Sequence, residues 1–494
     1  MKTASAALAA AALAGCAVGP HYHAAPVVPA ATRVGAGSRS DSARVFFDSL
    51  AAARSADTLR AIARLRVRRV AAESIADLAW LDILRDSTLT RLVATALEQN
   101  RDLAAAQARV REFRADAGVA WAPLLPSLTV NGSASTNQVA FAAFPPIAYK
   151  ALRVTGDVAW ELDFWGHTRR GLQAANADLA AQDAAERAAV LSLVSAVATG
   201  YLQLLELDQE RRIAEQTLSS RQVTLALARQ RFARGLISEL DVRQFEAQVA
   251  VPATRLAQVE QLRAQQEHAL NALLGEGPTA IPRGGSLAAA ARAVTVPDSL
   301  PSSLLARRPD VEEAERTYAA ATARVGVADA ARLPTISITG SWGTQAPTAA
   351  TLFGSNDKVY QLQGAISFPV FTGGRLENQA RAARARADGA RAQYEQTVLT
   401  ALREAGDALV GVRGARDQMV ADETQATALR RGLELATLRY RTGVASYLEV
   451  LDAERGLFDA ELALSQAELQ QLTAAVQLYK ALGGSWAERP ARRR

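Results

Sequence analysis

Side chains that carry chemistry are scarce in this sequence of 494 residues. Cysteine occurs once, at Cys16, so an internal disulfide is excluded. Methionine occurs twice and histidine four times, and the histidines are not spaced like metal ligands. The sequence also lacks a Ser-His-Asp arrangement and a phosphate-binding loop. An enzyme would have no residues to carry its reaction, and neither a cofactor nor a metal is expected.

Aromatic residues make up only 5% of the chain, although hydrophobic residues reach 49%. The apolar residues are mainly Ala and Leu, interleaved with Arg, Gln and Glu, which is typical of long packed helices. The net charge is +6 and the pI is near 9.6. Because the arginines alternate with acidic residues along predicted helical faces, they form no single basic patch, and nucleic-acid binding is not expected.

The N-terminus has the pattern of an export signal. Lys2 precedes a short apolar run over residues 4–14, which is too short to cross a bilayer, and the run ends in LAGC at 13–16. Small residues before a cysteine are what a lipoprotein signal peptidase requires, so Cys16 is predicted to be lipidated. A lipid-anchored, exported protein of a double-membraned bacterium is predicted.

One stretch occurs twice: RFARGLISELDV begins at 231 and RYRTGVASYLEV begins at 439, an offset of 208 residues. The same offset matches positions across most of the chain without an insertion or deletion, so one unit of roughly 180 residues is used twice. The predicted segments are a signal peptide 1–15, a tether 16–44, an N-terminal periplasmic segment 45–85, a first repeat 86–275, a linker 276–303, a second repeat 304–484 and a C-terminal tail 485–494.

Each repeat is predicted to begin with a helix, over 86–121 and 310–332, that stops before prolines. After the prolines, apolar and polar residues alternate with a period of two. The pattern predicts four strands, near 127–137, 151–164, 335–343 and 360–371. Their length and alternation are typical of tilted membrane strands, although a half-buried soluble hairpin has the same pattern. Because four strands cannot close a barrel, several protomers are required.

A very long helix is predicted next, over 166–233 and 374–441, each roughly 100 Å long at 1.5 Å per residue. A shorter helix returns over 239–274 and 447–482, and Pro252 predicts a kink or break in the first of them. The uncharged run 188–205 has the length of a transmembrane helix, but the matched positions 396–413 carry charges, so neither is predicted to lie in lipid. The fold class is mainly α, with long helical hairpins from two tandem repeats and a membrane β part of four strands per chain.

Several motifs, in order, carry a family resemblance: LLPSLTVNGS at 124–133, WELDFWG at 160–166, GLISELDV at 235–242, FPVFTGGR at 368–375 and GVASYLEVLDAE at 443–454. With the LAGC motif, the chain resembles the outer-membrane efflux channels of the TolC and OprM kind, in the lipoprotein branch called NodT. The resemblance implies a homotrimer that forms a twelve-stranded outer-membrane β-barrel above a helical periplasmic tunnel. It also implies three partners: a periplasmic adaptor protein, an inner-membrane transporter of the RND type, and outer-membrane lipid.

The repeated stretch is similar to the periplasmic tip of these channels, where helix-to-helix turns meet the adaptor. The residues implied to bind the adaptor are Arg231, Gly235, Leu236, Ser238, Arg439, Gly443, Val444 and Ser446. The residues implied to line the aperture are Asp452, Asp241 and Glu449.

Backbone chemistry offers a second explanation for some of these residues. The two glycines suit a left-handed turn between helices. The spacing from Ser238 to Asp241, and from Ser446 to Glu449, is that of a helix N-cap and its third residue, so both acids have two possible roles. Asp452 lies one turn further in, where capping does not explain it, and its repeat counterpart Gln244 is uncharged.

The predicted function is a passive outer-membrane exit duct for small molecules such as drugs, opened at its tip by an adaptor. The alternatives are a lipid-anchored coiled-coil scaffold without a pore and an exit channel for type I protein secretion. The alternating strands favour a channel, because a scaffold does not need them.

Overall fold

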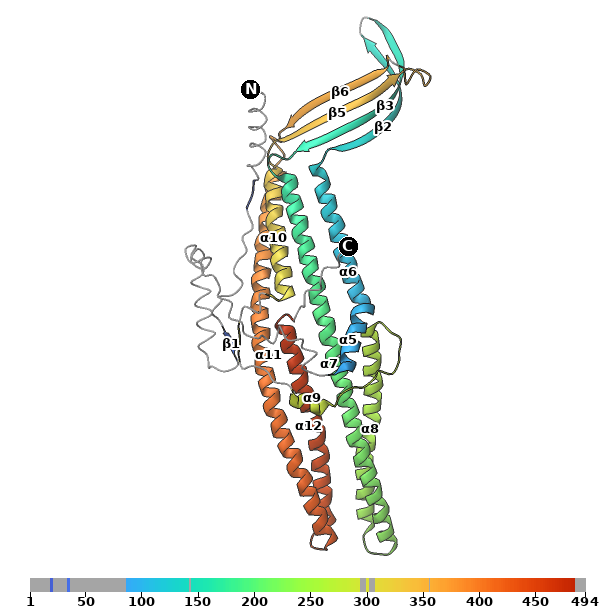
Figure 1. Ribbon diagram of the computed structural model, residues 1–494, viewed down its shortest axis with the longest axis vertical. Helices are drawn as coiled ribbons and strands as arrows, with labels where there is room; N and C mark the ends of the chain where they lie inside the picture. The colour runs from blue at the N-terminus through green and yellow to red at the C-terminus, as the bar shows by residue number, and fades with distance from the viewer. Residues whose placement is uncertain are drawn as a thin grey trace. The chain divides into compact units, whose positions relative to one another are not determined.

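The computed structural model describes residues 18–20, 33–35, 86–141, 144–293, 299–301, 307–354 and 356–484 (Figure 1). The predicted signal peptide, Cys16, most of the tether, the N-terminal periplasmic segment 45–85 and the C-terminal tail lie outside the described residues. The chain divides into two compact units. The strand unit comprises Met1–Ala25, Gln107–Ala185 and Glu312–Thr397, and the helical unit comprises Pro26–Ala106, Glu186–Val311 and Val398–Arg494.

The strand unit contains one antiparallel sheet of four strands in the order β2-β3-β5-β6. The strands are β2 (Ser127–Phe141), β3 (Phe144–Leu162), β5 (Thr335–Ala346) and β6 (Lys358–Ser367). The register places the even-numbered apolar residues on one face, where Leu128, Val130, Trp342, Tyr360, Leu362 and Ile366 are exposed. Over residues 127–137 of β2 the opposite face is polar, and there Asn131 Nδ2 donates to Asp157 Oδ2 at 2.6 Å. An exposed apolar face on long strands suits contact with lipid.

Two strand predictions were wrong at their ends. A loop was expected between 137 and 151, but the antiparallel pairing of β2 and β3 continues there, and Val139 lies opposite Ile147. The last strand was expected to reach 371, but β6 ends at Ser367. Pro369 follows within two residues and has no amide hydrogen for the sheet.

The predicted first helix, 86–121, is two helices, α5 (Ser87–Gln99) and α6 (Arg101–Trp121), followed by the 3₁₀ turn η2 (Ala122–Leu124). Asn100 separates them with an extended backbone, φ −61° and ψ 130°. Its Oδ1 accepts from the amide of Leu103 at 2.9 Å, which caps α6, and its Nδ2 donates to the carbonyl of Leu273 at 2.9 Å. The side-chain chemistry of Asn100 therefore outweighs the helical periodicity at this point.

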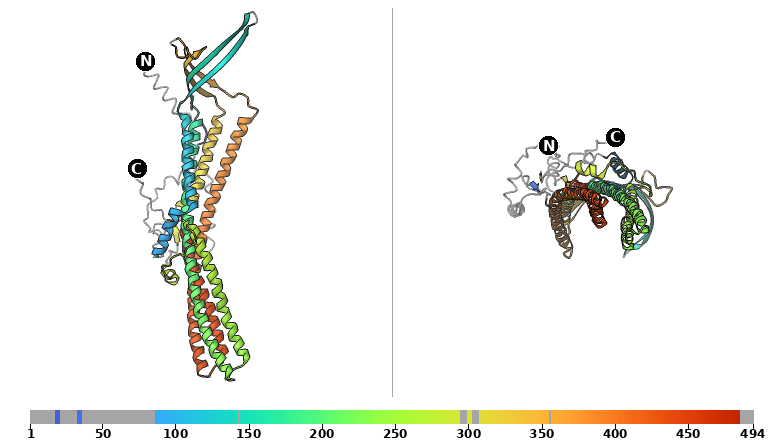
Figure 2. Two further views of the ribbon diagram at one scale, coloured as in Figure 1. Left: turned by 90° about the vertical axis from the view of Figure 1, so that its right-hand side faces the viewer. Right: turned by 90° about the horizontal axis from the view of Figure 1, so that it is seen from below.

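Two hairpins make up most of the helical unit. The first joins α7 (His167–Ala233) to α8 (Glu239–Leu274), and the second joins α11 (Arg375–Arg441) to α12 (Tyr447–Ala481). Viewed along the helices, the hairpins lie side by side along an arc, with α12 next to α7 (Figure 2). A kink or a break was expected at Pro252, and α8 continues through this residue without a break.

One described helix, α7, contains an 18-residue window that is apolar enough to cross a membrane. In the helical unit its side chains Leu191, Val197 and Tyr201 are buried in the main core together with Leu472 and Val476 of α12. A helix that buries its apolar residues against other helices has the pattern of a packed core helix.

The helical unit repeats one junction in both copies. Arg308, 208 residues after Asn100, precedes α10 (Pro309–Ala330), and its NH1 donates to the carbonyl of Ala481 at 2.9 Å. Ala481 is the counterpart of Leu273, so the same carbonyl is bonded in each copy. Gly275 and Gly483 follow with φ of 76° and 83°, and a Cβ on Gly275 would lie 2.5 Å from the carbonyl oxygen of Gln99. The end of α8 therefore lies against the junction of α5 and α6, and the end of α12 lies against the residues just before α10.

The linker has more structure than its Gly/Pro-rich sequence predicts. It contains α9 (Leu287–Ala293), which packs against α12, and β4 (Ser299–Pro301), which pairs with β1 (Arg33–Gly35) from the predicted tether.

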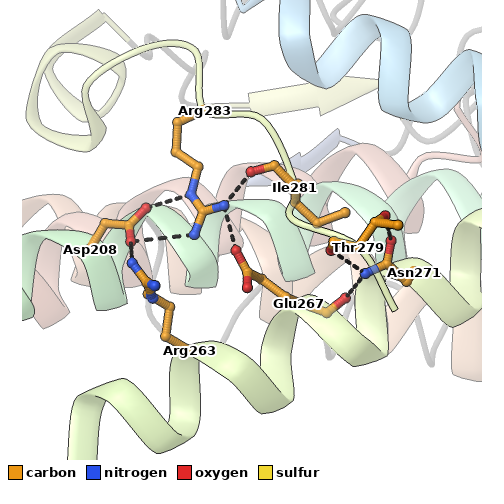
Figure 3. A network of polar contacts seen from close by, with 7 residues as sticks. All are labelled: Asp208, Arg263, Glu267, Asn271, Thr279, Ile281 and Arg283. Carbon is orange, nitrogen blue, oxygen red and sulfur yellow. Dashed lines mark hydrogen bonds and ion pairs between the residues drawn. The ribbon is translucent and has the colours of Figure 1, made fainter. Parts of the chain in front are cut away.

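A polar network holds the first part of the linker to the α7–α8 hairpin (Figure 3). Arg283 in the linker pairs with Asp208 of α7 at 2.7 Å and with Glu267 of α8 at 2.6 Å. Asn271 Nδ2 also donates to the carbonyl of Thr279 at 2.7 Å. One linker side chain thus bridges both helices of the hairpin.

The following linker residues are fixed by Asp86. Its Oδ2 accepts from the hydroxyl of Tyr201 at 2.9 Å and from the amide of Gly285 at 2.8 Å, while its Oδ1 caps α5. Burial alone would raise the pKa of Asp86, but the bond from Gly285 and the other hydrogen bonds lower it overall. A Cβ on Gly284 would lie 2.2 Å from Asp86 Oδ1, so only glycine fits there without rearrangement.

Candidate functional site

Both hairpin turns have the same backbone geometry. The amides of Gly235 and Leu236 donate to the carbonyls of Phe232 and Arg231 at 2.8 and 2.9 Å. The amides of Gly443 and Val444 make the equivalent bonds at 3.1 and 2.9 Å. Gly235 and Gly443 have φ of 73° and 77°, and a Cβ on either would meet open space. Glycine is therefore needed for the left-handed backbone.

The apolar residue after each glycine is exposed. Leu236 has 68% of its surface accessible and Val444 has 70%. A hydrophobic residue at this position of a helix C-terminus commonly packs back onto its own helix. Here both side chains remain uncovered, so each turn carries an exposed apolar side chain at its end.

The two N-caps differ, although their sequences are alike. At the first turn, Ser238 Oγ accepts from the amide of Asp241 at 3.2 Å, and Asp241 Oδ2 accepts from the amide of Ser238 at 2.9 Å. This is a complete capping box, and the hydrogen bond from the Ser238 hydroxyl lowers the pKa of Asp241. Capping thus accounts for Asp241 in the isolated protomer.

The second turn corrects one prediction. Ser446 occupies the N-cap position of α12, but its side chain makes no capping bond. Glu449 instead forms an ion pair with Arg439 at 3.5 Å across the turn. The longer glutamate reaches a cation on the preceding helix, so the capping role is wrong for Glu449, and Arg439 holds it at the turn.

Asp452 lies on an exposed face of α12. Its side chain is 78% accessible, and its only described ion pair is with Arg455 at 3.5 Å, one turn along the helix. Such an exposed pair is worth about 0–1 kcal/mol, so it leaves the carboxylate available for other contacts.

A row of side chains that the sequence did not predict connects the two hairpins. The Arg231 guanidinium donates to the hydroxyl of Tyr440 and lies 5.4 Å from the centre of its ring. The ring of Tyr440 meets Tyr447 edge-on at 5.3 Å, and Tyr447 meets Phe245 at 4.2 Å. In order the row passes through α7, α11, α12 and α8. A sequence signal existed, because a chain with 5% aromatics places several of them close to its two turns.

The row borders a cavity of about 470 Å³ between the hairpins. Arg231, Asp241 and Ser446, three of the predicted site residues, line it. The other lining residues are Thr224, Leu227, Ala228, Ile237, Gln244, Phe245, Tyr440, Tyr447, Leu448 and Leu451. The cavity is lined mostly by apolar side chains with two charged ones, Arg231 and Asp241, which is a common composition for a binding pocket.

No described group of three or more His, Cys, Asp or Glu side chains is placed to hold a metal ion. The described part of the chain also presents a lipid-compatible strand face and two helical hairpins that end in a partly apolar cavity. These features define a class: a membrane protein that enters the bilayer with β-strands and carries a long helical extension.

The chain belongs to the outer membrane efflux protein family, whose pattern matches residues 92–276 and 300–484. The two matched segments begin 208 residues apart, which confirms the tandem repeat. As the motifs indicated, the chain is therefore an outer-membrane efflux protein.

Individual relatives agree with this assignment. The toluene efflux pump outer membrane protein TtgC of Pseudomonas putida is 34% identical over 418 residues, covering 84% of this chain and 86% of TtgC. The pyoverdine export outer membrane protein OpmQ of the same species is 33% identical over 430 residues, covering 85% and 91%. Among solved structures, the outer-membrane channel OprN has a TM-score of 0.80 and 29% identity, covering 95% of this chain and 100% of OprN.

Proposed function

We propose that the chain assembles as a homotrimer whose twelve strands close a β-barrel, and that it acts as a passive exit duct and not as an enzyme. The main observation in support is the cavity between the two hairpins. It is bordered by Arg231, Tyr440, Tyr447 and Phe245, and the turn on either side carries an exposed apolar residue. The sheet supports the oligomer, because its four strands leave two edges that a bilayer does not tolerate unpaired.

The partner proposed for this cavity is a helical hairpin of a periplasmic adaptor protein. Leu236 and Val444 offer apolar contacts at the turns, while Arg231, Arg439 and Asp241 offer charges of both signs around them. An amphipathic helix that docks in a groove needs this combination of apolar anchors and a polar rim. Gly235, Ser238, Gly443 and Ser446 shape the turns that carry these contacts.

Asp452 is the proposed aperture residue, together with Glu449 and Asp241. A threefold axis would bring three copies of the exposed Asp452 carboxylate toward one another, where like charges repel. Arg455 offsets part of this charge within each protomer. The mouth would therefore be acidic and would open when adaptor binding draws the hairpins apart.

The remaining assignments follow from the same proposal. Cys16 is lipidated and anchors the chain in outer-membrane lipid, and an inner-membrane transporter of the RND type supplies the energy. The cargo is proposed to be small organic molecules, in keeping with the toluene and pyoverdine in the names of two relatives.

Photo-crosslinking tests the adaptor contact. A photoreactive amino acid at position 236 or 444, in the protein's own host, should yield a product containing the periplasmic adaptor. Leu236→Glu combined with Val444→Glu should abolish efflux and this contact, whereas Leu236→Ile with Val444→Ile should retain both. Both positions are exposed, so heat-stable oligomer should form in either variant. Wild-type efflux by the glutamate variant would refute the assignment.

Channel activity is tested separately in planar bilayers. The purified protein should conduct ions, and Asp452→Ala should raise the conductance by removing the acidic constriction. Absence of conductance in both proteins would count against a duct and favour a scaffold.

A further inference from the structure

Residues 18–20, close to the N-terminus, pack against the rest of the strand unit. The amide of Val18 donates to the carbonyl of Trp165 at 3.0 Å. The guanidinium of Arg170 donates through NH2 to the carbonyl of Gly19 at 3.3 Å. The amide of Val18 is therefore bonded by the turn after β3, and the carbonyl of Gly19 is bonded by the first turn of α7.

The opposite side of the stretch touches α10 backbone to backbone. Gly19 has a φ of +103°, and a Cβ on it would lie 2.5 Å from the Cα of Gly326. A Cβ on Gly326 would in turn lie 3.1 Å from the carbonyl oxygen of Val18 and from the Arg170 side chain. The contact thus requires glycine at position 19 and tolerates little more than glycine at 326.

Comparison of the repeats shows that helix geometry does not explain Gly326. A Cβ added to its counterpart, Gly118, would meet no atom within 4 Å, so that glycine faces open space. A glycine inside a helix costs about 0.5–1 kcal/mol relative to alanine. At 326 this cost is associated with the close approach of the N-terminal stretch.

The groups that receive the stretch lie at the ends of the membrane strands. β3 ends at Leu162, three residues before Trp165, and Trp165 Nε1 donates to the carbonyl of Pro334, which directly precedes β5. Arg170 is only 4% exposed and also donates to Gln173 Oε1 at 2.8 Å. Tryptophan is common where membrane strands leave the hydrocarbon region.

We propose that Val18 and Gly19, with Trp165, Arg170 and Gly326, form an N-terminal latch that fixes the position of the lipid anchor. This inference rests on the proposed lipidation of Cys16. Only two residue steps separate Cys16 from Val18, a reach of roughly 7 Å. The latch therefore holds the acylated cysteine at the ends of the strands, so that its acyl chains enter the leaflet beside the sheet.

The consequence concerns membrane insertion. An anchor on a free tether samples many positions, whereas a latched anchor holds the strand ends at the bilayer surface at a high effective concentration. Loss of the latch should leave acylation intact and reduce strand insertion.

Hydrogen exchange and three valine variants test the latch. In wild-type protein, the amide of Val18 should exchange slowly in the N-terminal lipopeptide. Gly19→Val and Gly326→Val should both remove this protection and reduce the heat-stable, membrane-inserted oligomer at least severalfold. Gly118→Val, the same change at the matched open position, should do neither. Because Gly19→Val leaves α10 unaltered, agreement between the first two variants excludes misfolding of α10 as the cause.

Radioactive palmitate labelling separates the latch from lipidation. All three variants should incorporate label like the wild type, and Cys16→Ala, exported through a conventional leader, should incorporate none. Adding Gly326→Val to Cys16→Ala should cause no further loss of insertion, because the latch acts through the anchor. Unlabelled wild type would overturn the lipidation of Cys16. Normal labelling with unchanged Val18 exchange in Gly326→Val would overturn the latch alone.

Discussion

Glu206 should make the stability of the protein depend on pH. It lies on α7 one turn before Glu210, and the two residues are 3% and 4% exposed. Arg255 of α8 contacts both Glu210 oxygens, at 2.6 and 2.5 Å, whereas Ser465 of α12 donates to Glu206 at 3.4 Å. The Arg255 guanidinium thus bonds directly to Glu210 and acts on Glu206 only through its charge. Burial, followed by the charge of Glu210, raises the pKa of Glu206 to about 8.

The direction in which stability changes with pH follows from proton binding by Glu206. Unfolded, Glu206 has a pKa near 4.5. Between that value and about 8 the folded protein keeps a proton that the unfolded chain releases, so the free energy of unfolding falls as pH rises through this window. A difference of roughly 3.5 pKa units corresponds to about 5 kcal/mol per protomer at and above the upper value.

Glu206→Gln should remove this dependence. Glutamine keeps the shape, stays neutral at every pH and retains a group for Ser465. The variant should match the wild type near pH 4.5 and exceed its stability by up to about 5 kcal/mol at pH 8.

Thermal unfolding of the detergent-solubilised protein at pH 5, 6.5 and 8 measures the effect. Glu215→Gln is the matched control, since Glu215 lies on the same helix with an exposed side chain. This control should follow the wild-type pH profile. Parallel profiles for Glu206→Gln and the wild type would refute the reasoning, as would a lower stability of the variant at pH 8.

Three further changes test other parts of the structure. Gly284→Ala should destabilise the protein by about 1–3 kcal/mol, because the added methyl group displaces Asp86; a melting temperature equal to that of Gly285→Ala would contradict this. Asn100→Ala should cost about 1–3 kcal/mol in denaturant unfolding, since it leaves the carbonyl of Leu273 without its donor, whereas Asn100→Arg should recover part of the loss. Tyr440→Phe should lower stability by about 1 kcal/mol, and Tyr440→Ala by more because the ring contact is also lost; equal melting temperatures for these two variants would show that the ring contributes nothing.

Much of the fold was accessible from local chemistry. The change of period after Pro126 and Pro334 located the strands, and the turn residues placed the start of α8 and α12 correctly. Gly275 and Gly483 marked where these helices end. Such features depend on neighbours in the sequence, so a single chain is enough to predict them.

What the sequence could not supply depends on distant partners. Asn100 interrupts a helical pattern because a carbonyl 173 positions away needs a donor. Of the two roles left open for Glu449, capping is not the one observed, because the side chain pairs with Arg439 of the preceding helix. The row from Arg231 to Phe245 joins residues that are not equivalent in the two repeats, so the repeat itself gave no indication of it.

The aromatic row also limits the symmetry of the proposed assembly. Three protomers would present six hairpins, and at low detail the ring would look sixfold. Tyr440, Tyr447 and Phe245 lie between the two hairpins of one chain. In the proposed trimer, the boundary between neighbouring chains would be built from the other faces of these hairpins. Alternate grooves of the proposed ring would therefore be chemically distinct, and a partner that bound all six would have to recognise two different surfaces.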